Sequence, residues 1–366
     1  MNIKDINNNI KTFTIIFVGI ITLLNGCTKE ERITLNKHEK MIKIKVKKSG
    51  SASSFFTHKD TIALNGINEN LFDAAPIIKA NLKIIVMFNP LSKNILILNR
   101  SGKLLSKIEK DGDGPGEFRF IQCGTLDTNN NIYIYDHVLK RITKYDAKGK
   151  YIFSLNVKYN SDNIRKMTCD NNGYIYLFHA PITGNDGFVS IYNNKGFVKF
   201  IFDPIKGFEP YYKRGFLDGG IIFSKNDGIF ATYIFSYKIA KYSKGVVTYF
   251  GKKLPIYKPL KKSRNDNHNI LTNNYYKSTI IKSLFIIDNS RILVQEFMNF
   301  NPTSKYKMHK NLVFYSISGV YLGVLSMNKY INFNCSDGKY LIQFIPPPFK
   351  TYNNINLKAK LIIYKI

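Results

Sequence analysis

Histidines are the side chains of this sequence with the clearest potential for chemistry, and their spacing can be weighed first. His137 and His179 each follow a predicted strand rich in Ile and Tyr, at equivalent places in two successive repeats. Two such histidines could meet if the repeats pack side by side. However, a metal site needs further ligands, and two histidines alone fall short of one. The chain also has no CxxC pair. We therefore favour packed or solvated histidines and expect neither a metal nor a cofactor.

A glycine-rich acidic segment is the second candidate. It reads Asp111-Gly112-Asp113-Gly114-Pro115-Gly116-Glu117-Phe118. The glycines permit backbone angles closed to other residues and the proline stiffens the bend, which suits a connector between two repeats, with Phe118 packed between them. The alternative is a ligand or cation contact through the three acidic side chains. The segment does not match the calcium-loop pattern, and without Gly-Lys-Ser/Thr and a following helix it is not a phosphate loop.

The N-terminus predicts export and lipid attachment. Lys4 and Lys11 precede an apolar run of 11 residues (14–24), which is too short for the roughly 20 residues that span a bilayer. The run ends in Leu-Asn-Gly-Cys, which resembles the bacterial lipobox, so we expect cleavage of residues 1–26 and acylation of Cys27. The alternative is an ordinary cleaved signal with a chance cysteine. Residues 27–40 are polar and predict a tether.

Three other cysteines remain after Cys27, namely Cys123, Cys169 and Cys335. An odd number in an exported chain requires at least one free thiol. Each lies near the start of a predicted strand among apolar residues, which favours buried free thiols. A disulfide that joins Cys169 to either of the other two stays open.

The charge balance is strongly basic, with 54 lysines and arginines against 25 acidic residues. Such a balance can indicate a polyanion partner. Only 8 of the 54 are arginine, the residue that nucleic-acid readers use for bidentate contacts. Because Asn, Ile and Tyr are abundant as well, we attribute the charge mainly to compositional bias on solvated strands and do not expect a nucleic-acid partner.

An internal repeat predicts the architecture. Its unit is a short strand, an Asp/Asn/Gly turn, a strand rich in Ile and Tyr, a third strand, a Lys-Gly turn and a last strand; the clearest copy spans residues 120–157. Six units at a spacing of about 40–50 residues predict an all-β, six-bladed β-propeller over residues 41–366, with four-stranded blades. The alternation of Ile42, Ile44 and Val46 with lysines predicts an N-terminal strand that completes the final blade beside residues 357–366. Residues 258–274 predict an inserted loop, and helical signal is nearly absent.

The glycine-rich segment, together with the Tyr-Asp-x-x-Gly-Lys sequence downstream, resembles the six-bladed β-propeller lipoproteins related to NHL-repeat proteins, over residues 61–366. This resemblance implies a binding or scaffold module without catalytic activity. Some related propellers are metal-dependent lyases or lactonases with a site in the central channel, so an enzyme of that type is the alternative. A Lys-Glu-Glu sequence after Cys27 resembles a surface-export signal and favours an outer-membrane lipoprotein on the cell surface, the periplasmic face being the alternative. The expected partners are the membrane, through the lipid, and an outer-membrane protein or a glycan. Candidate binding aromatics are the paired tyrosines Tyr211, Tyr212, Tyr275 and Tyr276.

Overall fold

The computed structural model describes residues 57–64, 67, 71–73, 75–158, 164–179, 187–203, 208–213, 218–262, 267–300, 308–327, 333–346 and 359–365. The predicted signal peptide, Cys27, the tether and the strand around Ile42–Val46 lie outside these residues. Within the described parts of the chain, no helix combines the length and the apolar character that a membrane crossing requires.

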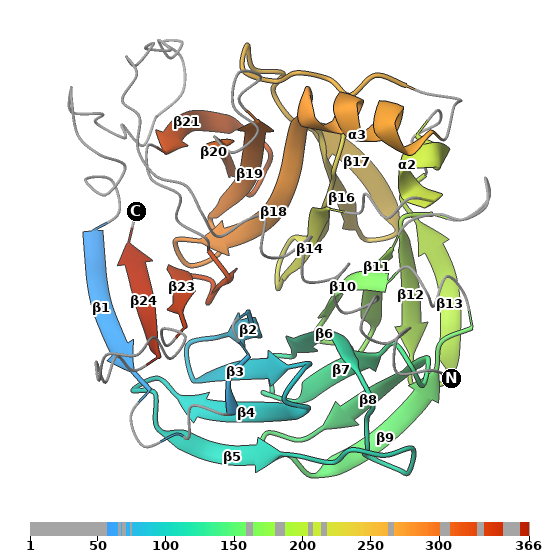
Figure 1. Ribbon diagram of the computed structural model, residues 1–366, viewed down its shortest axis with the longest axis vertical. Helices are drawn as coiled ribbons and strands as arrows, with labels where there is room; N and C mark the ends of the chain where they lie inside the picture. Colours follow the sequence, from blue (N-terminus) through green and yellow to red (C-terminus); the bar gives the residue numbers. More distant parts are fainter. Residues whose placement is uncertain are drawn as a thin grey trace.

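Six four-stranded antiparallel sheets are arranged around a common centre as the blades of a propeller (Figure 1). In each of the first five blades the chain begins at the innermost strand and moves outward, so the sheet order equals the chain order. The predicted all-β, six-bladed architecture with four strands per blade is confirmed. The strands of these blades are β2 (Ile77–Ala80), β3 (Ile84–Asn89), β4 (Asn94–Asn99) and β5 (Leu104–Ile108) in blade 1; β6 (Ile121–Leu126), β7 (Ile132–Asp136), β8 (Arg141–Tyr145) and β9 (Tyr151–Asn156) in blade 2; β10 (Ile164–Cys169), β11 (Ile175–His179), β12 (Val189–Asn193) and β13 (Gly196–Ile201) in blade 3; β14 (Gly219–Ser224), β15 (Gly228–Tyr233), β16 (Ile239–Ser243) and β17 (Val246–Phe250) in blade 4; and β18 (Thr279–Ile287), β19 (Ile292–Phe300), β20 (Met308–Ser316) and β21 (Tyr321–Met327) in blade 5.

Blade 6 combines strands from both ends of the chain. It contains β22 (Cys335–Ser336), β23 (Leu341–Ile345), β24 (Lys360–Lys365) and, as its outer strand, β1 (Thr57–Ala63). β1 pairs antiparallel with β24, from Thr57 opposite Lys365 to Ala63 opposite Lys360. The segment that pairs with β24 therefore lies downstream of the strand that the alternation at residues 42–46 predicts.

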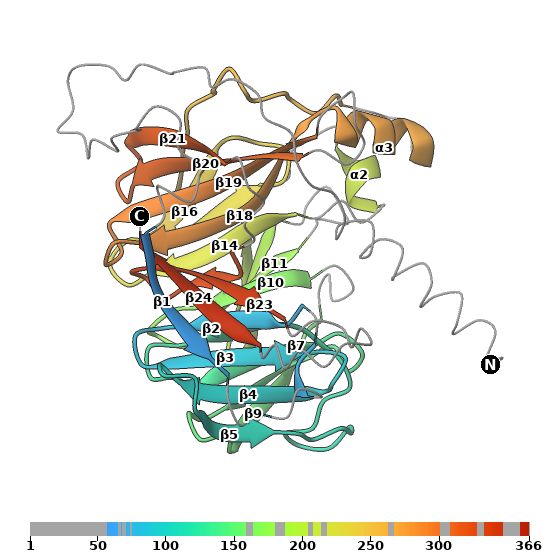
Figure 2. The ribbon, with the colours of Figure 1, turned by 60° about the vertical axis from the view of Figure 1, so that its left-hand side comes forward.

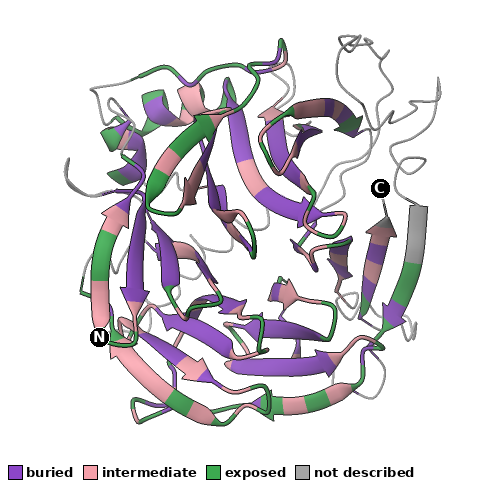
Figure 3. Ribbon diagram, turned by 180° about the vertical axis from the view of Figure 1, so that it is seen from behind, coloured by how far each residue is buried: buried purple, intermediate pink, exposed green. Residues whose placement is uncertain are grey.

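Alternate residues of each central strand pack into different interfaces, which explains the continuous apolar runs. On β7, Ile132 and Ile134 join a hydrophobic cluster shared with blade 1, whereas Tyr133 and Tyr135 join a cluster shared with blade 3. The described residues form six such clusters, one at each contact between neighbouring blades. Figure 3 shows the result, in which buried residues concentrate on inner and middle strands and exposed ones on the outer strands.

The repeated Asp/Asn turn is stabilised by its own first side chain. In the turn between β6 and β7, Asp127 Oδ1 accepts from the backbone N–H of Asn129 (2.9 Å) and of Asn131 (2.8 Å). Asp170 does the same for Asn172 and Tyr174 in the next blade, both at 2.9 Å. A short side-chain acceptor at the first turn position thus satisfies two backbone donors locally, which is why this residue recurs in the sequence.

Two helices depart from the expected all-strand chain. α2 (Glu209–Lys213) lies between blades 3 and 4, and α3 (His268–Tyr276) overlaps the end of the segment 258–274, which the sequence predicts as a loop between blades 4 and 5. Figure 2 shows both helices together at one end of the molecule. Asn267 caps α3, because its side chain accepts from the backbone N–H groups of Asn269 and Ile270. Leu271 is the residue of α3 that is buried, so the helix carries little of the apolar periodicity that would have revealed it.

A candidate ligand pocket between blades 3 and 4

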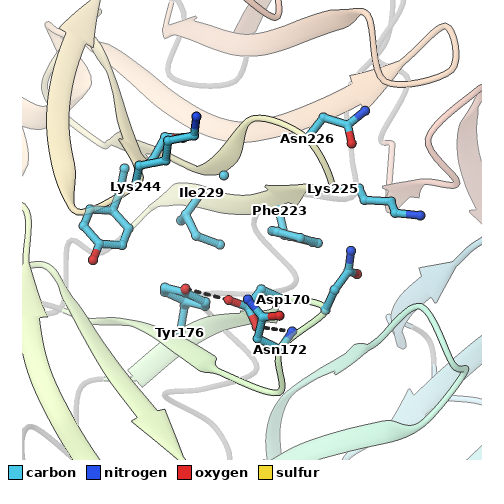
Figure 4. Close-up of a pocket in the computed structure, with 12 residues that line it drawn as sticks. Asp170, Asn172, Tyr176, Phe223, Lys225, Asn226, Ile229 and Lys244 are labelled. Carbon is cyan, nitrogen blue, oxygen red and sulfur yellow. Dashed lines mark hydrogen bonds between the residues drawn. The ribbon is translucent and has the colours of Figure 1, made fainter.

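A pocket of about 400 Å³ opens where hairpins of blades 3 and 4 meet. Blade 3 contributes the β10–β11 turn and the start of β11, and blade 4 contributes the β14–β15 and β16–β17 turns with the adjoining strand ends. Figure 4 shows side chains of the two blades facing one another across this space. We call it the inter-blade pocket; its lining residues are Asp170, Asn171, Asn172, Tyr176, Phe223, Lys225, Asn226, Gly228, Ile229, Tyr242, Ser243 and Lys244.

The carboxylate in the pocket, that of Asp170, accepts its hydrogen bonds from its own hairpin. Besides the two backbone N–H groups on Asp170 Oδ1, the Tyr176 hydroxyl donates to Asp170 Oδ2 at 3.0 Å. Burial, reinforced by this carboxylate, raises the pKa of Tyr176. Blade 2 holds the same pair, with Tyr133 donating to Asp127 at 3.1 Å. The Asp170–Tyr176 pair is therefore a feature of the repeat rather than of the pocket.

Apolar groups form the floor of the pocket. Tyr176 and Ile229 are buried, while Phe223 and Tyr242 are partly exposed toward the opening. The Lys199 ammonium of blade 3 lies 5.1 Å from the centre of the Tyr242 ring, in a cation–π contact between the two blades. Flat apolar surfaces of this kind can stack against a sugar ring or a planar group.

Amides and ammonium groups form the rim. Asn171, Asn172, Lys225, Asn226 and Lys244 are exposed. Among the residues that the structure describes, none of these five side chains has a hydrogen bond or ion pair. The groups available to a ligand are thus hydrogen-bonding amides and two positive charges, above an aromatic floor. This combination can hold a polar ligand that has apolar ring faces and negative charge.

The glycine-rich segment lies elsewhere, between β5 of blade 1 and β6 of blade 2. Phe118 is fully buried in the cluster shared by these blades. Arg141 clamps the segment by donating to the carbonyls of Asp113 (2.9 Å), Gly114 (2.7 Å) and Glu117 (2.7 Å). Gly116 has a φ of +76°, and a Cβ there would lie 2.9 Å from Tyr151, so this bend requires glycine.

The acidic side chains of this segment are engaged by neighbouring donors. Asp111 pairs with Lys93 at 2.6 Å and Asp113 pairs with Arg119 at 2.7 Å. These contacts lower the pKa of both carboxyl groups. Glu117 Oε2 accepts from the Gly114 N–H at 2.8 Å. The three carboxylates therefore brace the connector, and their contacts within the described residues do not form a cation site.

The structure places the four candidate tyrosines in different surroundings. Tyr211 and Tyr212 are buried within α2, where both rings pack against Phe235. Tyr275 is mostly enclosed and its hydroxyl donates to Asp218 at 3.1 Å, whereas Tyr276 is 49% exposed. Burial of the large apolar ring area therefore accounts for Tyr211 and Tyr212, whereas Tyr276 keeps an exposed ring.

The histidines also have separate surroundings. The His137 ring packs edge-on to Phe120 at 6.5 Å, and the buried His179 ring packs edge-on to Phe200 of β13 at 5.8 Å. In the described part of the chain, no three His, Cys, Asp or Glu side chains are grouped to hold a metal ion. Cys123, Cys169 and Cys335 are free and buried, as the sequence favoured.

Sequence reasoning did not find the inter-blade pocket. Asn172, Lys225 and Lys244 each belong to a repeat turn that looks like any other turn. The one available signal was the position of Phe223 and Tyr242 directly beside two lysine-bearing turns of the same blade.

Comparisons with known proteins agree with the fold. A family model, DUF5128, described as a 6-bladed beta-propeller, matches residues 29–320. Among solved structures, a Bacteroides fragilis NCTC 9343 protein whose name describes it as exported has 14% identity and a TM-score of 0.64, covering 87% of this chain and 97% of that one. A member of the DUF4221 family from Bacteroides vulgatus ATCC 8482 has 10% identity and a TM-score of 0.60, covering 85% and 97%. No curated protein matches by sequence. At these identities the solved structures bear on the fold alone.

Proposed function

We propose that this chain, which belongs to the six-bladed β-propeller family DUF5128, is a lipid-anchored binding module of the cell envelope that holds an acidic glycan in the inter-blade pocket. The observation that carries the proposal is the composition of the pocket, an aromatic floor under a rim of amides and lysines with no competing partners among the described residues. Its carboxylate is saturated by hydrogen bonds from its own hairpin. The groups left for a ligand are therefore amides and ammonium groups, which suit binding and orientation.

The anchor in this proposal is Cys27, which would be acylated after removal of residues 1–26 and would place the propeller at the outer membrane. Mass spectrometry of the N-terminal peptide should show a diacylglyceryl cysteine. A Cys27→Ser variant should leave the membrane fraction. Accessibility of the folded chain to protease on whole cells should then distinguish the cell surface from the periplasmic face. An unmodified Cys27 in the mature protein would contradict the anchor.

Ligand binding is tested with the lipidated chain in mild detergent, first on an array of neutral and acidic glycans and then by calorimetry. Asn172→Ala removes a rim amide but keeps the backbone N–H that Asp170 accepts. Asn129→Ala is the matched control, because Asn129 holds the same turn position in blade 2. Lys225→Met is matched by Lys195→Met, an exposed lysine in a blade 3 turn away from the pocket lining.

We expect acidic glycans to bind more tightly than neutral ones. Each pocket variant should weaken binding at least tenfold, or about 1.4 kcal/mol, with each control unchanged. Equal affinity in variant and control would place the ligand outside the pocket. Retention of an outer-membrane protein by the wild type, without glycan binding, would make the partner a protein instead.

A further inference from the structure

The innermost strands of the propeller carry a group of basic side chains that the inter-blade pocket does not involve. β2, β6, β10, β14, β18 and β22 are the inner strands of their blades and surround the centre of the ring (Figure 1). Neighbouring inner strands are in contact around the ring. Lys79 lies on β2, and Arg165 and Lys166 lie on β10. We call these three residues the channel cations.

The Lys166 side chain extends from blade 3 to the inner strands of the next two blades. Its ammonium donates to the carbonyl of Gly219 on β14 and, at 3.1 Å, to the carbonyl of Lys282 on β18. A side chain of blade 3 thus contacts backbone of blades 4 and 5. Both acceptors are neutral, so Lys166 gains hydrogen bonds there but no opposite charge.

Lys79 lies on an inner strand, β2, that contacts β6 of blade 2 and β22 of blade 6. The ionisable groups that influence its pKa are the thiols of Cys123, Cys169 and Cys335, which lie on the inner strands β6, β10 and β22. Burial raises the pKa of Cys123 and Cys335 to about 12, so these thiols stay neutral at physiological pH.

The nearby carboxylates already have partners. Asp218 accepts from the Lys282 ammonium at 2.6 Å and from the Tyr275 hydroxyl at 3.1 Å. Glu296 forms a buried ion pair with Lys310. Among the described residues, none of the channel cations forms an ion pair, and Lys79 and Arg165 also form no side-chain hydrogen bond. Burial lowers the pKa of all three.

Cations that are partly buried without an ion pair are costly to a fold, and groups with a perturbed pKa in a concave place are candidates for a functional role. The three channel cations are half-buried, so part of each side chain stays accessible. A guanidinium and two ammonium groups supply the hydrogen-bond donors and the positive charge that a small oxyanion requires. We propose that the centre of the ring binds a small oxyanion, a carboxylate or a phosphate, through Lys79, Arg165 and Lys166. This site does not depend on the glycan proposal, since it shares no residue with the inter-blade pocket.

The test measures the thermal unfolding midpoint of the full chain in increasing inorganic phosphate or succinate, with sodium chloride at matched ionic strength as reference. Calorimetry then gives the dissociation constant. The variants are Lys79→Met and Arg165→Met. Lys195→Met is the control that removes one exposed charge, and Asn172→Ala is the control for the inter-blade pocket.

We expect a saturable rise of the midpoint with phosphate or succinate in the wild type and in both controls. Each channel variant should bind at least tenfold more weakly. Without anion, Lys79→Met should unfold at the same or a higher temperature than the wild type, because it removes a charge without counter-charge. Comparison of the two anions identifies whether carboxylate or phosphate is preferred.

Three results would overturn the proposal. The first is a midpoint in phosphate and succinate that equals the one in sodium chloride. The second is anion binding that persists unchanged in both channel variants. The third is marked destabilisation of the anion-free protein by Lys79→Met, which would show that this ammonium is already compensated. Loss of glycan binding in Asn172→Ala with intact anion binding would separate the two sites.

Discussion

Arg100 links blade 1 to blade 6. Blade 1 is continuous in sequence, whereas blade 6 is made from strands of both chain ends. The Arg100 Nη2 lies 2.7 Å from Asp337 Oδ2, and its Nη1 donates to the Asn81 carbonyl at 3.3 Å. The Asp337 side chain is fully buried and Oδ1 accepts from the backbone N–H groups of Lys339 (2.9 Å) and Tyr340 (2.8 Å). Removal of the guanidinium therefore leaves Oδ2 without its cation.

We predict that Arg100→Met lowers the free energy of unfolding by about 2–3 kcal/mol. Breaking a fully buried ion pair costs about 3–5 kcal/mol, and this pair is weakened by the 25% exposure of Arg100. Urea unfolding, followed by fluorescence and circular dichroism, should show a lower midpoint at an unchanged slope. Lys107→Met is the matched control, because Lys107 pairs with Glu109 on the exposed side of blade 1, where such a pair contributes less than about 1 kcal/mol.

A double-mutant cycle with Asp337→Asn isolates the pair itself. The double variant should be less destabilised than the sum of the two single variants, by at least about 1 kcal/mol. An Arg100→Met protein within 0.5 kcal/mol of the wild type, at matched slope, would refute the reasoning. The blade 6 contact would then be held by its hydrophobic cluster and backbone bonds alone.

Two further predictions follow from buried ionisable groups. The three buried thiols should resist a thiol reagent at pH 8 in the native protein and react rapidly in urea. The reason is that a pKa of about 12 for Cys123 and Cys335 leaves roughly a thousandfold less thiolate than in the unfolded chain. A thiol that reacts equally fast in both states would contradict this. Burial lowers the pKa of Lys166 to about 8, below its unfolded value of about 10.4. The free-energy cost of burying the charged ammonium is therefore fully present below pH 8 and is relieved between pH 8 and 10. The free energy of unfolding of the wild type should rise relative to that of Lys166→Met across that window, by at most about 3 kcal/mol. A difference between the two proteins that stays constant from pH 7 to 10 would exclude the effect.

The blades could be predicted from the sequence because their determinants are local. An Asp or Asn that accepts two backbone N–H groups within its own turn leaves a mark at fixed spacing, as at Asp127 and Asp170. Burial on both faces requires apolar residues at successive positions, as along β7. The turn signal recurs at Asn81 in blade 1 and at Asp337 in blade 6, so a degraded copy can be recognised from a clear one.

The helices and the tyrosines show where local signals fail. α3 is rich in Asn and buries Leu271 alone, so neither propensity nor periodicity indicates a helix. Tyr211 is buried because α2 and Phe235 enclose it. The sequence around a tyrosine pair does not indicate whether the rings are buried or exposed. For the pocket, the deciding fact is which turns of blades 3 and 4 meet, and this depends on how the blades stack.

The channel cations are the extreme case of this dependence on the assembled ring. β2, which carries Lys79, and β22, which carries Cys335, come from opposite ends of the described chain and are in contact only when blade 6 closes against blade 1. Lys166 contacts β18 only when blades 3, 4 and 5 stand in order around the centre. A ligand that binds the closed ring and not the open chain stabilises closure by mass action. An oxyanion at the centre would therefore reinforce the same closed ring that the Arg100–Asp337 pair holds at its periphery.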